Sequence, residues 1–217
     1  MIHLLHIGKT GGTALRYALR DVPDVRNGYL VLHTHNTRLQ DIPNGDKVIF
    51  FLREPLSRFY SGFYSRKRNG RPRYNSEWSD QEALAFGRFE SPMKLLDFAI
   101  SGCSINRQNA TEALETIGHV KDHYTYWLRS VEYLEARKDD ILHIGFLDSF
   151  SEDFECLKSK LGLPSEVALP TSSLDAHVNP EYEQPALCPA QQFFFDEWFA
   201  RDIELYQHCT QHFSTTR

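Results

Sequence analysis

The sequence predicts an α/β fold in which a central parallel sheet is flanked by helices. Short apolar runs of strand length alternate along the chain with segments whose apolar residues recur at helical spacing. The strongest of these runs, Lys47–Leu52, is continuously apolar after its lysine and does not alternate with polar residues. This pattern is typical of a strand that is buried on both faces. A chain of 217 residues can bury one sizeable core, so we expect a single domain over residues 1–217.

The N-terminal elements set the pattern. The apolar run Ile2–Ile7 predicts a short buried strand, and a glycine-rich loop follows it. Leucine and alanine at helical spacing predict a helix over Thr13–Arg20. Tyr29–Leu32 is expected to form a second strand. Lys47–Leu52 is the clearest strand, because it is apolar and β-branched and follows a Pro-Asn-Gly turn.

The rest of the chain continues this alternation. The expected elements are a helix from Pro55, a mostly helical stretch over 80–140, a strand over Ile141–Leu147, a helix over Phe150–Leu161, a long loop over 164–190 and a final helix over Pro189–His208. Asp148 and Ser149 are placed to cap the helix that starts at Phe150. Because ligands of parallel sheets bind at the carboxyl ends of strands, we expect them near residues 8–13 and Arg53.

Composition excludes several classes of protein. A formal net charge of −5 argues against a general nucleic-acid binder, so no nucleic-acid partner is expected. The cysteines are widely spaced and form no CxxC pair, which argues against a disulfide framework or a zinc site; they are Cys103, Cys156, Cys188 and Cys209. No apolar window reaches the length of a membrane span. We therefore expect a cytoplasmic protein without a membrane span.

The loop HIGKTGGTAL, residues 6–15, has the composition of a phosphate-binding loop in an unusual order. A Walker A loop would need its first glycine at position 3, where this chain has His3, and here the glycine pair follows Lys9. Gly11 and Gly12 would let the backbone approach a phosphate, and the N–H groups at the start of the next helix would face it. The alternative is an ordinary strand–helix turn with a surface lysine.

A second candidate anion site lies in FFLREPLSRFYSGFYSR, residues 50–66. Arg53 stands at the end of the predicted strand, and arginine is suited to bidentate contact with a phosphate. Ser57 and Ser61 recur at helical spacing after it and could complete the site. Between Arg53 and Arg73 there are seven basic residues and one acidic residue. The alternative is a solvated helix face, which suits residues 66–68 better than Arg53.

A histidine pair follows the second predicted strand in VLHTHNTRL, residues 31–39. A side chain that removes a proton from a hydroxyl near neutral pH needs a pKa close to 7, which histidine has. His33 and His35 are therefore candidates for a catalytic base. The alternatives are surface histidines or metal ligands, for which His3 and His6 could join, although their expected burial in a strand argues against it.

Together the two anion motifs resemble those of sulfotransferases that use 3′-phosphoadenosine 5′-phosphosulfate (PAPS). The resemblance is greatest to the carbohydrate branch, which includes heparan sulfate 2-O-sulfotransferase and its bacterial relatives. HIGKTGGTAL resembles their 5′-phosphosulfate loop, and FFLREPLSRFYSGF resembles their 3′-phosphate motif. The match extends from residue 2 to about residue 75 and is diffuse from 80 to 217. It implies a P-loop-NTPase-like three-layer fold.

The resemblance also implies how the donor nucleotide is held. Lys9 matches the lysine that contacts the phosphosulfate and stabilises charge on the leaving group. The residues that match the loop around the same group are Thr10, Gly11, Gly12 and Thr13. Arg53 and Ser61 match the residues that bind the 3′-phosphate, and Ser57 matches less closely. Residues 164–190 weakly resemble a late loop that folds over the nucleotide.

By the same match His35 is the catalytic base and His33 assists it. The implied reaction is in-line transfer of a sulfuryl group from PAPS to a hydroxyl, with PAP (adenosine 3′,5′-bisphosphate) as the product and no metal required. A saccharide acceptor is expected, and residues 66–73 could steer an anionic sugar polymer.

Two alternatives stay open. One is a P-loop phosphotransferase, which would need a carboxylate for Mg²⁺, with Asp148 as the candidate. The other is a non-catalytic anion- or glycan-binding module on the same fold.

Overall fold

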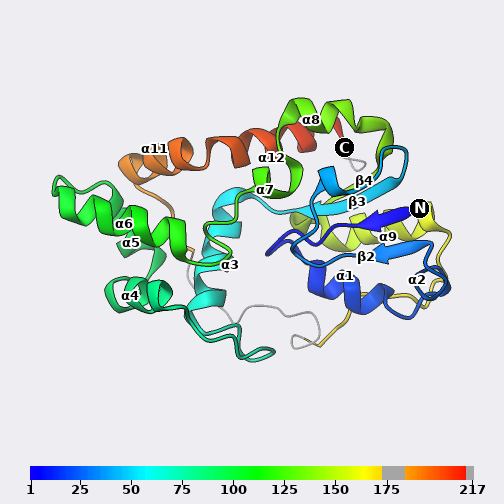
Figure 1. The fold of residues 1–217 in the computed structure, drawn as a ribbon, viewed down its shortest axis with the longest axis horizontal. Coiled ribbons are helices and arrows are strands. Elements are labelled where there is room, and N and C mark those ends of the chain that lie inside the picture. Colours follow the sequence, from blue (N-terminus) through cyan, green and yellow to red (C-terminus); the bar gives the residue numbers. More distant parts are fainter. Residues whose placement is uncertain (173–183, 214–217) are drawn as a thin grey trace. The chain divides into compact units, whose positions relative to one another are not determined.

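The computed structural model describes residues 1–172 and 184–213. Four parallel strands form one sheet in the order β2-β1-β3-β4 (Figure 1). The strands are β1 (Ile2–Leu4), β2 (Leu30–Leu32), β3 (Lys47–Leu52) and β4 (Ile141–Phe146). The predicted α/β class with a parallel sheet between helices is therefore confirmed, whereas the likeness to P-loop NTPases stays a prediction.

The chain divides into two compact units. The first, here called the sheet unit, draws its described residues from 1–54, 124–178 and 204–217. The second, here called the helical unit, draws them from 55–123 and 179–203. The expectation of a single domain over 1–217 stays a prediction.

Helices cover both faces of the sheet because successive strand residues point to opposite sides. On one face Leu4, Ile49 and Phe51 pack with apolar residues of α1 (Gly12–Leu19) and α9 (Phe150–Leu161). The opposite core contains Val48, Phe50 and Leu52, together with residues of three further helices. These helices are α7 (Tyr124–Leu128), α8 (Val131–Ala136) and α12 (Ala200–His212). The short helices of this unit are α2 (Pro23–Arg26), η1 (Leu39–Asp41), η2 (Lys138–Asp140) and η3 (Leu147–Ser149).

The strand order creates a switch point between β1 and β3. The connection through α1 carries the chain from β1 to β2 on one side, and the chain then crosses to β3 on the other side of β1. The loops that leave the carboxyl ends of β1 and β3 therefore diverge, and such a point is the usual ligand site of an open parallel sheet. Residues 8–13 follow one of these ends and Arg53 follows the other.

Two local predictions in the sheet unit need correction. β1 ends at Leu4 rather than at residue 7, because the chain leaves the sheet for a turn after Leu5, whose N–H still donates to the Ile49 carbonyl at 2.9 Å. The cap expected from Asp148 and Ser149 is wrong, since the Ser149 hydroxyl donates to Asp153 Oδ2 at 2.7 Å and caps no backbone group.

The final helix is two helices, α11 (Pro189–Trp198) and α12, because the chain departs from helical dihedral angles at the buried Phe199. By contrast, Gly162 ends α9 in the left-handed conformation, as its position predicts.

The helical unit is built on α3 (Pro55–Lys67), which begins at Pro55 as predicted. Its other helices are α4 (Asp80–Arg88), α5 (Pro92–Ala99), α6 (Ser104–Thr116) and α11. Their core is rich in aromatic side chains, among them Phe59, Phe63 and Phe195. α5 begins with Pro92 in its first turn, and α6 ends at Thr116, two residues before Gly118.

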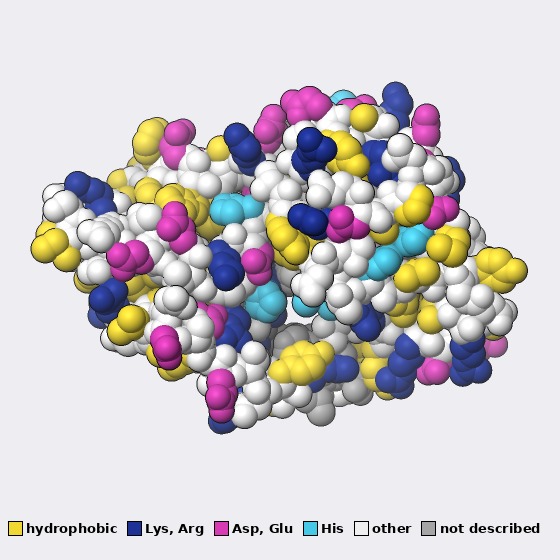
Figure 2. All heavy atoms as spheres, in the orientation of Figure 1, with side chains coloured by type: hydrophobic (Ala, Val, Ile, Leu, Met, Phe, Trp, Pro, Cys, Tyr) yellow, Lys and Arg dark blue, Asp and Glu magenta, His cyan; other side chains and the backbone are white. Residues whose placement is uncertain are grey.

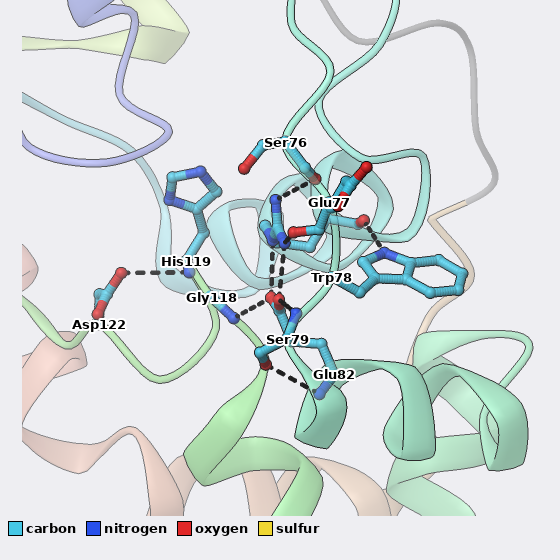
Figure 3. A network of polar contacts seen from close by, with 9 residues as sticks. Ser76, Glu77, Trp78, Ser79, Glu82, Gly118, His119 and Asp122 are labelled. Carbon is cyan, nitrogen blue, oxygen red and sulfur yellow. Dashed lines mark hydrogen bonds and ion pairs between the residues drawn. The ribbon is translucent and has the colours of Figure 1, made fainter.

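A buried ion pair joins α3 to α4. Arg66 donates to both carboxylate oxygens of Glu82, at 2.7 and 2.6 Å, and Gly118 N donates to the same carboxylate at 3.0 Å. Figure 3 shows Gly118, Ser79 and Glu82 converging in this network. Burial raises the pKa of Glu82, but the hydrogen bonds from Arg66, Ser79 N and Gly118 N outweigh it, and the net pKa is lowered. Arg66 therefore does not belong to the solvated face that the sequence suggested.

Within the described part of the chain, no helix combines the length and the apolar character needed to cross a membrane.

Candidate functional site

The loop after β1 has an unusual backbone. Lys9 adopts a left-handed conformation with φ of 67°, and Gly11 does so with φ of 84°. A non-glycine residue in this region costs roughly 1–3 kcal/mol and persists only where its surroundings fix it. Here the Thr10 hydroxyl donates to the Ile7 carbonyl at 3.0 Å, and Leu15 N donates to the Gly11 carbonyl at 3.2 Å. These hydrogen bonds within the loop therefore help to hold the backbone of Lys9 in its left-handed conformation.

Both loop glycines are required by close packing. A Cβ on Gly11 would lie 2.8 Å from the Phe150 ring, and Gly11 already needs a positive φ. A Cβ on Gly12 would lie only 2.1 Å from Cδ2 of His6. Thr13 lies in the first turn of α1, and this turn carries no acidic side chain. The backbone N–H groups of the turn are therefore suited to bind an anion.

The hydrogen bonds of His35 define its tautomer. His35 is exposed, and its Nδ1 lies 3.0 Å from the backbone carbonyl oxygen of His6. A carbonyl oxygen only accepts, so the neutral ring carries its proton on Nδ1 and its lone pair on Nε2. The indole N–H of Trp127 donates to the His35 carbonyl at 2.8 Å and fixes the backbone. The side chain is therefore arranged to accept a proton at Nε2.

His6 connects this histidine to the lysine loop. The ring of His6 packs against the ring of His35, with centroids 3.9 Å apart. Burial lowers the pKa of His6 to about 3, and the charges of His35, Arg16 and Lys9 lower it further in that order. The charge of Lys9 is the smallest of these contributions. His6 remains neutral at pH 7 and packs against His35.

His33 is held by different partners. Its Nε2 lies 2.9 Å from Nδ1 of His3, and its carbonyl accepts from Arg16 at 2.8 Å. Burial lowers the pKa of His33, and the charges of His3 and Arg16 add to this effect. The two members of the predicted pair therefore stack on different rings, His33 on His3 and His35 on His6.

Arg53 directly follows β3 and its backbone is clamped. The hydroxyl of Tyr124 accepts from Arg53 N at 3.0 Å and donates to the Arg53 carbonyl at 2.5 Å. Tyr124 is itself fully buried, so its position is set by the core. Arg53 is partly exposed, which suits a side chain that is to meet an anion.

Ser57 and Ser61 lie on α3, in the helical unit. Ser57 is partly exposed, whereas Ser61 is buried. Lys9, His35 and Arg53 all belong to the sheet unit. The assignment of Ser57 and Ser61 to a phosphate site depends on the sequence resemblance alone.

Two of the basic residues in the segment after Arg53 are structural. Arg66 is buried against Glu82, and Arg58 is buried with its guanidinium 3.6 Å from the carboxylate of Asp202. Arg66 therefore cannot steer an anionic polymer, which corrects that part of the expectation for residues 66–73. On the surface displayed in Figure 2, basic and acidic side chains are interspersed.

Among residues 1–172 and 184–213, no group of three or more His, Cys, Asp or Glu side chains is arranged to hold a metal ion. The central part of the loop predicted over 164–190, residues 173–183, lies outside the described residues. Comparison of the chain with protein-family models, with curated proteins and with solved structures gives no match.

Several supporting residues could not be found from sequence spacing. Tyr124 lies 71 positions from Arg53, and Trp127 lies 92 positions from His35. The aromatic run Tyr124–Trp127 follows no motif that would link it to either residue. The sequence offers His6 as a possible metal ligand, whereas in the structure its ring packs against His35 and its carbonyl accepts from the His35 ring.

Proposed function

We propose that this chain is a PAPS-dependent sulfotransferase that moves a sulfuryl group to a hydroxyl of an acceptor, and that the acceptor is a saccharide. The observation that carries the proposal is the His35 ring. It is held as the Nδ1–H tautomer by the carbonyl of His6, and it packs on the His6 ring, three residues before Lys9 in the loop. A base and a cation in one neighbourhood are what transfer of an anionic group to a hydroxyl needs.

The donor nucleotide would use the two strand ends at the switch point. The loop of residues 8–13 would hold the 5′-phosphosulfate through backbone N–H groups and Lys9. Arg53, whose backbone is clamped at the end of the adjacent strand β3, would hold the 3′-phosphate. Ser57 and Ser61 join this second site by the sequence resemblance.

The chemistry follows from these assignments. His35 Nε2 takes the proton of the acceptor hydroxyl as its oxygen forms a bond to sulfur. The bond between sulfur and the bridging oxygen breaks, and its electron pair passes to the 5′-phosphate of PAP. Lys9 neutralises the charge that develops there, as expected for a loose transition state controlled by positioning and electrostatics. The His6 carbonyl then stabilises the imidazolium of His35 through the Nδ1–H bond.

The test is transfer of sulfur-labelled PAPS to a panel of saccharides by the wild type and four variants. His35→Gln should reduce turnover about 10²–10⁴-fold, which is the usual contribution of a general base. Lys9→Ala should reduce it about 10²–10³-fold, as for loss of one electrostatic contact to a transition state. His212→Gln and Lys47→Ala change an exposed histidine and an exposed lysine of the same unit and should retain turnover. Full activity in His35→Gln would overturn the assignment of the base.

The two alternatives predict different results. A P-loop phosphotransferase would consume ATP in the presence of Mg²⁺ and leave PAPS intact. The buried His3 in β1, at the position of the first Walker A glycine, argues against it. A binding module would retain PAP or a glycan and turn over neither nucleotide.

A further inference from the structure

Three residues next to the candidate site form a hydrogen-bonded chain. Nδ1 of His3 lies 2.9 Å from Nε2 of His33, and Nε2 of His3 lies 3.1 Å from Oδ2 of Asp46. His3 belongs to β1, His33 follows β2, and Asp46 precedes β3, so three adjacent strands contribute. The two rings are nearly parallel, at 12°. His3 is buried, whereas the side chain of Asp46 is 22% exposed.

The order of donors and acceptors in this chain follows from Asp46. The pKa of its carboxyl is lowered by hydrogen bonds from the amino group of Met1 and from His3, so it is ionised at neutral pH and can only accept. His3 Nε2 must then donate. In neutral His3, Nδ1 accepts, and His33 Nε2 becomes the donor. The basic nitrogen of neutral His33 is therefore Nδ1.

We propose that Asp46 and His3 are positioning and proton-relay residues for His33, and that they carry a proton away from the site through the buried His3 to the partly exposed carboxylate of Asp46. This inference rests on the proposed function, in which His33 assists the base. A proton that arrives at His33 Nδ1 displaces the Nε2 proton onto His3 Nδ1. His33 is then neutral again, and the cationic His3 forms an ion pair with Asp46, whose partly exposed carboxylate can pass the Nε2 proton to water. Proton exchange with water then returns both rings to their starting tautomers.

The charges around the relay favour movement in this direction. Burial is the main factor that opposes a lasting positive charge on His33, and the charges of Arg16 from α1 and of His3 from β1, when His3 is protonated, add to it. Asp46 faces His3 and the Met1 amino group. A lasting proton is therefore disfavoured on His33, and the carboxylate of Asp46 lies at the other end of the chain, in contact with His3.

The first test observes the relay without any substrate. Nitrogen NMR of the histidine rings in the full chain should show a scalar coupling across the hydrogen bond between His3 Nδ1 and His33 Nε2. It should also show neutral His33 protonated at Nε2. In Asp46→Asn the amide can donate to His3 Nε2, so the fraction of His33 protonated at Nδ1 should rise.

Matched variants separate the relay from a general loss of charge. Asp41→Asn removes an exposed carboxylate of the same unit that pairs with Arg38, and it should leave the His33 signals unchanged. His3→Phe preserves a ring in the core but removes both nitrogens, so the coupling should vanish. Unaltered His33 ring-nitrogen signals in both Asp46→Asn and His3→Phe would overturn the proposal.

The kinetic test shows whether the relay serves the reaction. Asp46→Asn should lower kcat for sulfuryl transfer and leave the KM for PAPS unchanged, because it touches proton removal and not nucleotide binding. A changed KM with an unchanged kcat would contradict the relay. If the NMR signature is present but PAPS is not consumed, the hydrogen-bonded chain stands and the proposed function fails.

Discussion

At the residue scale, the candidate base depends on a glycine that touches no substrate. Gly12 leaves room for the ring of His6, and His6 supplies both the ring and the carbonyl oxygen that hold His35. The same residue opens α1, so the position that starts the helix also admits the histidine. From the sequence, a glycine at position 12 is expected because the backbone there could approach a phosphate. The structure adds a second reason, since a Cβ at this position would collide with the His6 ring.

Gly12→Ala should therefore damage the site through His6. The new Cβ would meet the ring at 2.1 Å, so the ring must move and its contact with His35 is lost. We expect a loss of about 1–3 kcal/mol in the free energy of unfolding, as for overpacking in other cores, together with lower turnover. Urea denaturation and the transfer assay measure the two effects.

Gly87→Ala is the matched control, because Gly87 lies in α4 and a Cβ there meets nothing within 4 Å. It should be neutral or slightly stabilising, since alanine favours a helix over glycine by about 1 kcal/mol. Equal losses in the two variants would show that Gly12 has no special role.

At the scale of elements, the end of β3 is held by α7. Tyr124 of α7 lies in the core and both accepts from and donates to the backbone of Arg53. Trp127 of the same helix donates to the carbonyl of His35. One short helix thus fixes the backbone of two candidate site residues, which come from different loops. The aromatic side chains of α7 therefore pack in the core and also form hydrogen bonds to the backbone of two loops.

Removal of the Tyr124 hydroxyl should loosen Arg53. Tyr124→Phe leaves the ring in place but leaves Arg53 N and O without this partner, which should cost about 1–3 kcal/mol of stability. We also expect weaker binding of PAP with little change in kcat, because only the donor site is disturbed. Tyr126→Phe alters an exposed tyrosine of the same helix and should change neither quantity. Unchanged PAP affinity in Tyr124→Phe would contradict the clamp.

At the scale of the whole molecule, buried ionisable groups set the response to acid. Burial lowers the pKa of His143 to about 4, and that of His6 to about 3, so both are neutral in the folded protein. The unfolded chain binds protons on these histidines below about pH 6.5. Since the unfolded state then holds more protons, stability is lost as the pH falls from about 6.5 toward the folded pKa values.

The free energy of unfolding should therefore decrease by up to about 1.4 kcal/mol per pH unit for each histidine in this range. His143→Phe should reduce the slope, and His212→Phe, which changes an exposed histidine, should retain it. The slope is measured by urea denaturation between pH 7 and about pH 5. Glu82, whose pKa is lowered, remains ionised in the folded protein over this pH range and contributes little to the slope. A flat profile in the wild type would show that these histidines do not remain neutral on folding.

Local pattern predicts much of this molecule, and long-range contacts account for the rest. The strand over Lys47–Leu52 and the helix over Phe150–Leu161 have the predicted bounds, because their periodicity and flanking residues are strong. The cap at Ser149 was wrong because the hydroxyl binds the buried Asp153 instead. The clamp on Arg53 and the relay to Asp46 join residues distant in sequence, and no local pattern encodes such pairs.

The measurement that tests the central claim most directly is calorimetric titration of the protein with PAP and with 5′-AMP, which lacks the 3′-phosphate. We predict that PAP binds at least tenfold more tightly than 5′-AMP, a difference of about 1.4 kcal/mol, through a charge-assisted contact to Arg53. Arg53→Ala should abolish the preference, and Arg26→Ala, which changes an exposed arginine of the same unit, should retain it. Equal binding of the two nucleotides, or binding of neither, would contradict the sulfotransferase proposal.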